Sequence, residues 1–164
     1  MWAVVFCWVS LASSALARKL AFPLLGLQVV VPDIYTIEQA GPARVNLARK
    51  NSGVRVSIYR VEFGNLEKLT PTHEQQFLHH LRERLGRGSR VEMAPLVLSG
   101  RQGRQLVAAG NRSGAPWGMS AGWVFRGGQA WVVEVLYPGK QQAEGQALFH
   151  SLCHDLVWLT PERG

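Results

Sequence analysis

Residues 122–139 read GWVFRGGQAWVVEVLYPG, and this stretch decides the fold. Two runs of alternating apolar residues flank Gly127-Gly128, and glycine tolerates the positive φ angles that a two-residue hairpin loop requires. The loop sets the register, and the predicted partners are Phe125 with Ala130, Trp123 with Val132, and Ala121 with Glu134. Because both faces of this hairpin are apolar, we expect Trp123, Phe125, Trp131 and Val133 to be core residues, with the sheet covered on both sides.

Outward from the hairpin, turn residues and apolar periodicity divide the chain into further elements. Thr70-Pro71 is a helix start, because Thr can cap the first turn and Pro fits the first helical position. Two helices are predicted, from 71 to Gly86 and over 141–159. The predicted strands are 27–31, 44–49, 54–63, 91–98, 104–110, 119–126 and 129–137. This order predicts an α+β fold in which an antiparallel sheet is flanked by helices, an α/β/α sandwich.

In the predicted strand over 54–63, the apolar residues switch from one face of the strand to the other near its middle. Val56 and Ile58 share one face, whereas Val61 and Phe63 lie on the other. This switch predicts a β-bulge near Tyr59-Arg60.

The first seventeen residues have the composition of a signal peptide. They carry no charged side chain, contain an apolar run, and end in Ala15-Leu16-Ala17, which fits a cleavage site. The apolar run is short for a bilayer span. We therefore expect a signal peptide at 1–17 and a single domain at 18–164, with an uncleaved anchor or a different start codon as alternatives, and a periplasmic or secreted location.

Charge separates the classes of partner that this domain could bind. The chain has 18 basic and 11 acidic residues, a net charge of +7, and no motif that reads nucleic acid. A basic exported protein suits an anionic surface or an acidic protein, and scattered solubilising charge is the alternative. We expect no nucleic-acid partner and no stable transmembrane span after processing.

Five residues of the predicted meander and its turns form a candidate contact surface. Arginine and tryptophan together at strand ends are frequent at protein interfaces, although arginine also protects solvated sheet edges. The candidate binding residues are Arg101, Arg104, Arg112, Trp117 and Arg126.

Residues 118–122 read GMSAG and match G-x-S-x-G, the pattern around many nucleophilic serines. A nucleophile elbow needs a strand, a sharp turn at the serine and then a helix. Ser120 instead lies within a strand that continues to the Gly-Gly hairpin. Serine hydrolysis is therefore a minor alternative, and Gly118 and Gly122 are better explained by close approach of another element, such as the last helix.

The segment HSLCH supplies a possible metal or thiol site at His150, Cys153 and His154. Imidazole and thiolate ligate zinc or copper well. On a helical wheel, Cys153 faces the buried stripe while the two histidines lie toward solvent, so the three ligands diverge. A metal- or thiol-dependent protein is the second hypothesis, and the favoured prediction is no metal and no cofactor.

The element order resembles the PsbP-like superfamily, which includes the photosystem PsbP proteins and bacterial exported DcrB-like proteins. The resemblance is carried by VVVPD (29–33), VRVSIYRVEF (54–63), the Thr-Pro helix start, the apolar hairpin and FHSL (149–152). It implies a non-enzymatic α/β/α domain that binds or steadies a protein partner. The leading hypothesis is therefore an exported binding or accessory module that acts on a protein in the cell envelope.

Overall fold

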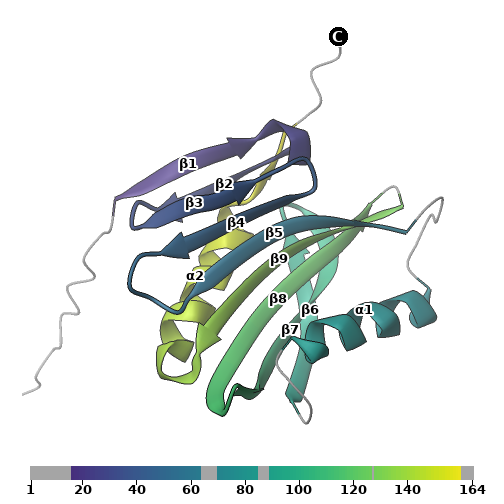
Figure 1. Ribbon diagram of the computed structural model, residues 1–164. Helices are drawn as coiled ribbons and strands as arrows, with labels where there is room; N and C mark the ends of the chain where they lie inside the picture. Colours follow the sequence, from purple (N-terminus) through teal and green to yellow (C-terminus); the bar gives the residue numbers. More distant parts are fainter. Residues whose placement is uncertain (1–15, 64–69, 85–88, 127, 160–164) are drawn as a thin grey trace, which may run out of the picture.

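The computed structural model describes residues 16–63, 70–84, 89–126 and 128–159, and its main body is a seven-stranded antiparallel sheet (Figure 1). The strand order is β3-β4-β5-β9-β8-β7-β6. Its strands are β3 (Tyr35–Ala40), β4 (Arg44–Arg49), β5 (Arg55–Glu62), β6 (Arg90–Leu98), β7 (Arg101–Arg112), β8 (Ala115–Arg126) and β9 (Gln129–Pro138). The helices are α1 (Pro71–Glu83) and α2 (Gln142–Asp155), with short 3-10 turns η1 (Pro23–Leu25) and η2 (Gly139–Gln141).

The central hairpin forms as the sequence predicts. Strands β8 and β9 pair with Phe125 opposite Ala130, Trp123 opposite Val132 and Ala121 opposite Glu134. Two further Ser-Gly turns, Ser99-Gly100 and Ser113-Gly114, take positive φ at both residues and close β6–β7 and β7–β8. The last four strands of the large sheet are therefore a meander.

A second, three-stranded sheet lies outside the predicted pattern. It consists of β1 (Ala17–Phe22), β2 (Leu27–Pro32) and β10 (Val157–Trp158) in the order β1-β2-β10. The prediction of a helix over 141–159 is wrong at its end, because α2 stops at Asp155 and Trp158 pairs with Leu27. Strands β1 and β3 were not predicted either, since most of their residues are exposed and show no apolar alternation.

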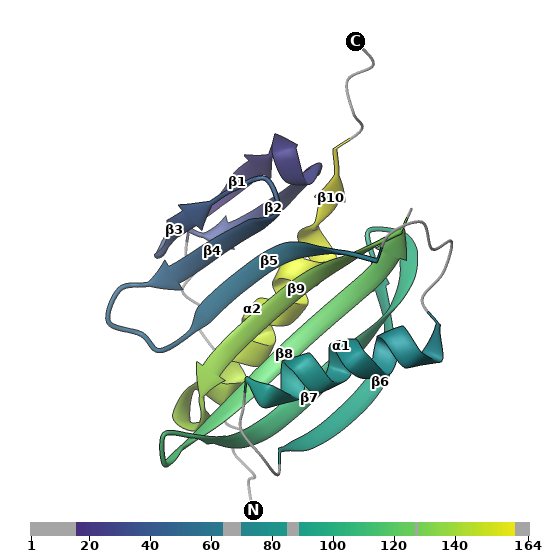
Figure 2. The ribbon, with the colours of Figure 1, turned by 45° about the vertical axis from the view of Figure 1, so that its right-hand side comes forward.

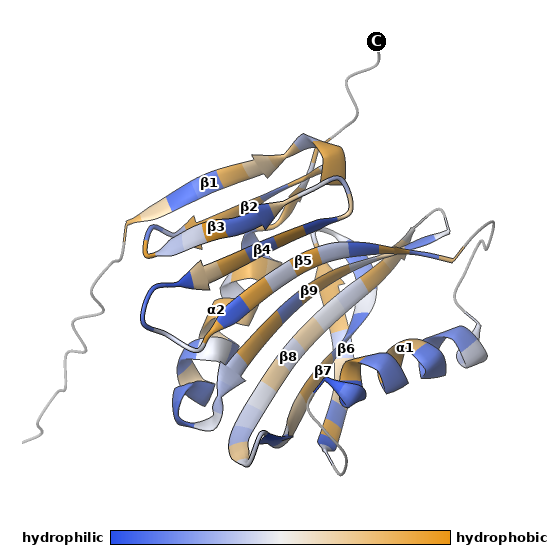
Figure 3. Ribbon diagram, in the orientation of Figure 1, coloured by the Kyte–Doolittle hydropathy of each residue, from blue (hydrophilic) through white to orange (hydrophobic). Residues whose placement is uncertain are grey.

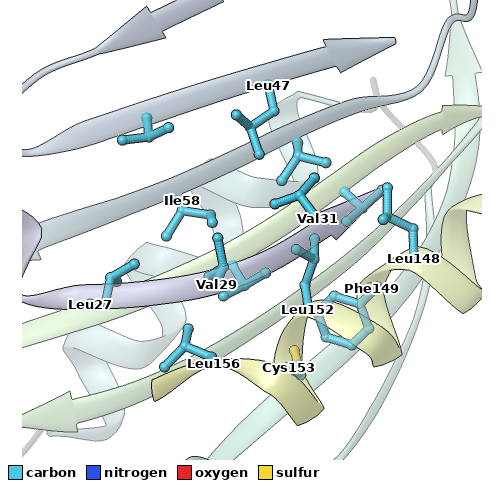
Figure 4. Packing of buried hydrophobic residues seen from close by; sticks show 14 of the residues in the cluster. Leu27, Val29, Val31, Leu47, Ile58, Leu148, Phe149, Leu152, Cys153 and Leu156 are labelled. Carbon is cyan, nitrogen blue, oxygen red and sulfur yellow. The ribbon is translucent and has the colours of Figure 1, made fainter. Parts of the chain in front are cut away.

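The two faces of the large sheet have different covers (Figure 2). Helix α1 lies on one face and buries Phe77 and Leu81 against it. Helix α2 and the three-stranded sheet share the other face, where apolar residues of β2, β4, β5, β9 and α2 form the larger core (Figure 4). The α+β prediction is confirmed in this coarse form, but the protein is richer in sheet than a helix-flanked sandwich.

The bulge predicted near Tyr59-Arg60 is wrong. Strand β5 pairs with β9 in an unbroken register from Arg55 to Glu62. The apolar parity changes because both faces of β5 are covered: Val56 and Ile58 enter the larger core, while Tyr59 and Val61 pack in the core under α1. The irregularity of this sheet lies instead between Ile37 and Gln39 on β3.

Glycines let α2 pack closely on β8 and β9. A Cβ at Gly122 would lie 2.5 Å from Leu96 of β6 and 3.0 Å from the Phe149 ring of α2, so the last helix approaches this position as predicted. A Cβ at Gly118 or at Gly145 would lie 2.1 Å from the ring of Tyr137. This ring is therefore held between β8 and α2. No helix among the described residues is long and apolar enough to cross a membrane.

Candidate functional site: an arginine-lined groove beside helix α1

Helix α1 covers only part of its face of the sheet, and a polar groove of about 220 Å³ lies on the uncovered part. We call it the arginine groove. Figure 3 shows hydrophilic residues interspersed along β4 and β5, the strands that form much of its floor. It is lined by Glu38, Arg44, Asn46, Leu47, Arg55, Val56, Ser57, Arg84, Arg112, Glu134 and Leu136.

Glu134 is the buried charge of the groove. It lies in the middle of β9 with 1% of its surface exposed. The Tyr59 hydroxyl donates a hydrogen bond to its carboxylate at 3.1 Å, and Arg84, the residue that ends α1, forms an ion pair with it. Burial raises the pKa of Glu134 above its ordinary value, while the guanidinium of Arg84 acts in the opposite direction. The pair therefore ties the end of α1 to the sheet.

A row of polar side chains leads across the strands to Glu134. The amide of Asn46 donates to Gln39 at 2.8 Å, and the Ser57 hydroxyl donates to Asn46 at 2.9 Å. Ser57 is the register partner of Glu134. Alternate residues of a strand share a face, so these groups from β3, β4, β5 and β9 lie in one line on the α1 side. Their mutual hydrogen bonds fix the floor of the groove.

Four arginines surround this floor, and they fall into two kinds. Arg55 contacts Glu38 at 2.8 Å, and Arg84 contacts Glu134, so these two positive charges are neutralised within the protein. Arg44 instead lies over the ring of Tyr59 at 4.7 Å, and Arg112 lies over the ring of Trp117 at 5.6 Å. Within the described ranges, neither Arg44 nor Arg112 has a carboxylate partner.

The chemistry of the groove suits the binding of an anionic group. A guanidinium held over an aromatic ring presents a fork of N–H donors that matches a carboxylate or a phosphate. Arg44 and Arg112 both have this environment and both line the groove. The groove can therefore hold an anion at these two side chains.

The five predicted contact residues lie on β7 and β8, toward opposite ends of β7. Arg112 and Trp117 come together beside the groove. Arg104 is eight residues earlier, about 27 Å away along an extended strand, and pairs with Glu74 of α1 at 3.1 Å. Arg101 is exposed at the start of β7, and Arg126 ends β8, where its backbone pairs with Gln129. The structure thus brings Arg112 and Trp117 together, and it places Arg101 and Arg104 toward the opposite end of β7.

The remaining groove residues carried little sequence signal. Glu134 was visible as one acidic residue inside the apolar run WVVEVL, which marks a buried charge that needs a partner. Arg84 and Arg44 are separated from it by 50 and 90 positions. The pairing of β4, β5 and β9 brings Arg44 near Glu134, and the packing of α1 on the sheet brings Arg84 there.

Ser120 lies in an extended strand with none of its surface exposed. Its hydroxyl is within 3.2 Å of the Tyr137 hydroxyl, and no helix follows it in the chain before β9. Ser120 pairs with Val135 of β9, and strand β8 continues from Ser120 to the hairpin at Arg126. The geometry of a nucleophile elbow is therefore absent at this serine.

The terminal helix separates the residues of the HSLCH segment. Cys153 is buried, whereas His150 and His154 are exposed, and His154 contacts Asp155 at 2.8 Å. Burial raises the pKa of the Cys153 thiol to about 12. No cluster of three metal-ligating side chains occurs within the part of the chain that the structure describes. The divergence expected from the helical wheel is confirmed.

The seven-stranded sheet with its two covering helices has a PsbP-like fold, as the sequence resemblance predicts. The solution structure of CyanoP, the cyanobacterial PsbP of Synechocystis sp. PCC 6803, aligns with a TM-score of 0.64 and 12% identity over 88% of this chain and 93% of that one. The Ran-binding protein Mog1p of Saccharomyces cerevisiae aligns with a TM-score of 0.63 and 9% identity over 89% and 97%.

A third solved structure is that of a mycobacterial protein. LpqN of Mycobacterium tuberculosis, described as involved in cell envelope biogenesis, aligns with a TM-score of 0.56 and 11% identity over 82% of this chain and 83% of that one. No family model matches the chain, and no curated protein matches it by sequence. At these identities the comparisons show a shared fold.

Proposed function

We propose that this protein is an exported, non-enzymatic accessory module that binds a protein partner in the cell envelope through the arginine groove. The observation that carries the proposal is the pair of aromatic-stacked arginines, Arg44 and Arg112, that line one groove without a carboxylate partner in the described chain. Unneutralised, oriented guanidinium groups are characteristic of surfaces that recognise an anionic partner. A single basic domain with this fold suits such a role.

One comparison supports a binding role, and another supports a role in the cell envelope. Mog1p is a Ran-binding protein, and LpqN is involved in cell envelope biogenesis. The uncharged, apolar segment 1–17 supports export of this chain. The larger predicted surface, which adds Arg101, Arg104 and Arg126 to Arg112 and Trp117, is the alternative to the groove, and the variant Arg101→Gln below tests it.

The test is capture of the partner by cross-linking in the native cell. The full chain, tagged at its C-terminus, is compared with the double variant Arg44→Gln/Arg112→Gln and with Arg101→Gln, which removes one equivalent charge outside the groove. We expect the envelope fraction to yield one specific protein with the wild type and with Arg101→Gln, and none with the double variant. Loss of the partner with Arg101→Gln would favour the extended surface instead.

Other outcomes would reject the proposal. Capture of the same proteins by all three variants would show that the groove is not the binding site. Turnover of an ester, phosphate or peptide substrate by the purified chain would reject the non-enzymatic role. Export has its own readout: we expect the mature protein in the envelope fraction with Arg18 as its first residue, and a cytoplasmic protein that retains Met1 would contradict it.

A further inference from the structure

We infer that the ligand of the arginine groove is an acidic peptide segment that places carboxylate side chains on both Arg44 and Arg112. This inference rests on the proposed function and specifies the chemistry of the partner. Its basis is the distribution of charge within the groove, where each of the four arginines can be assigned a role.

Two of the arginines belong to the protein's own structure. Arg84 is bound to Glu134, and Arg55 to Glu38. Burial of Glu134 beneath Arg84 keeps its negative charge away from an incoming ligand. The charge that a ligand meets therefore comes from Arg44 and Arg112, and it is positive.

The same two arginines are held in place before a ligand arrives. Each is stacked on an aromatic ring, Tyr59 for Arg44 and Trp117 for Arg112. Stacking restricts the long side chain and leaves the edge of the guanidinium free to donate two parallel hydrogen bonds to a carboxylate. Less conformational entropy is then lost on binding than with free surface arginines.

The groove favours a narrow segment over a membrane surface because its unpaired positive charge is confined to two side chains, Arg44 and Arg112. The Glu38–Arg55 pair has no net charge and adds nothing to the attraction of a broad anionic surface. A peptide can place its carboxylates on the two arginines alone. The floor adds Asn46 and Ser57, whose remaining hydrogen-bonding capacity suits the polar backbone of a peptide.

The experiment is a titration of the full chain into a fluorescein-labelled peptide, GEGSEGSEG, with GQGSQGSQG as the uncharged control. We expect saturable binding of the acidic peptide that weakens with added salt, and no binding of the control peptide. Arg44→Gln and Arg112→Gln should each weaken binding about tenfold, because each removes a charge-assisted contact. Lys19→Gln makes the same change in net charge at an exposed residue of β1, in the three-stranded sheet, and should leave affinity within about twofold.

A second variant separates a built site from general attraction. Trp117→Leu keeps every charge but removes the ring beneath Arg112. We expect the affinity for the acidic peptide to fall about threefold or more, with an unchanged fold by circular dichroism. Equal losses of affinity for Lys19→Gln and Arg112→Gln, or tighter binding to vesicles of phosphatidylglycerol than to the peptide, would overturn the inference. If the cross-linked partner is captured through the groove but the acidic peptide does not compete with it, the inference fails while the proposed function stands.

Discussion

The two faces of the seven-stranded sheet are made by the same strands, but they are covered to different extents. We call the fully covered face, under α2, the closed face, and the partly covered face, under α1, the open face. On β9, Trp131, Val133 and Val135 enter the larger core, whereas the residues between them, including Glu134, face α1. Helix α2 and a second sheet cover the first face, but α1 alone lies on the second. Because one helix cannot cover seven twisted strands, the uncovered part must be polar, and polar groups gathered on a rigid sheet can be used for binding.

The closed face should give the largest effect on stability. Trp131 is 9% exposed and packs edge-on against Trp158 with ring centroids 5.4 Å apart. We expect Trp131→Ala to lower the free energy of unfolding by about 3–5 kcal/mol, the range for truncation of a large buried aromatic. Urea denaturation measures the loss.

Trp117 on the open face is the matched position for comparison with Trp131. Trp117 lies beside the groove and is only partly buried. We expect Trp117→Ala to cost less than half as much as Trp131→Ala and to weaken ligand binding instead. Equal losses of stability for the two variants would contradict the distinction between a closed and an open face.

The Arg84–Glu134 pair should give the next largest effect, and this effect should depend on pH. Arg84→Met leaves Glu134 buried without its cation, so its pKa in the folded protein rises further above the ordinary 4.5. A carboxyl with a raised folded pKa favours the folded state below about pH 4.5, and this stability is lost as the pH rises through the folded pKa. We therefore expect a cost of about 1.5–3 kcal/mol at pH 7 that becomes small near pH 4.5.

Unfolding curves of Arg84→Met at several pH values measure this dependence. Arg82→Met is the control. Arg82 is exposed, lies two residues before Arg84 on α1, and has no ion pair among the described residues. It should stay within about 0.5 kcal/mol of the wild type at every pH. A penalty for Arg84→Met that does not change with pH would mean that lost packing of the arginine stem, rather than the charge on Glu134, sets the cost.

Close packing on the covered face can be tested by adding one methyl group. A Cβ at Gly118 would lie 2.1 Å from the Tyr137 ring, so the ring must move. We expect Gly118→Ala to cost about 1–3 kcal/mol by thermal or urea denaturation. Gly41→Ala adds the same group in ordinary contact, 3.7 Å from the Arg44 carbonyl, and should change stability by less than about 0.5 kcal/mol. Similar costs at both positions would mean that α2 does not need the gap at Gly118.

The same comparison explains what the sequence could and could not predict. The β8–β9 register and the core positions Trp123 and Val133 follow from local alternation around one glycine loop, and they are confirmed. Phe125 is only partly buried, because it lies near the end of its strand. The groove was not predicted, since Arg44 and Glu134 meet through the pairing of β4, β5 and β9, and Arg84 meets Glu134 through the packing of α1 on the sheet. Local pattern thus predicts the hairpin and its buried positions on both faces, whereas the groove depends on long-range topology.

The smallest expected effect concerns Ser120, which lies on the closed face despite its catalytic-looking motif. Its hydroxyl and that of Tyr137 are 3.2 Å apart and buried, so each satisfies the other. Ser120→Ala should cost about 1 kcal/mol, the typical net value of one buried hydrogen bond, and Tyr137→Phe should cost about the same. The double variant should cost less than the sum of the two, because it leaves no hydroxyl without a partner. A double-mutant cycle by urea denaturation measures this coupling.

A nucleophilic serine would behave differently. Ser120→Ala would then abolish ester hydrolysis with little change in stability, and Tyr137→Phe would show no coupling to it. We expect coupling between the two hydroxyls and no ester hydrolysis by the wild type, because a serine sealed beneath α2 is out of reach of a substrate.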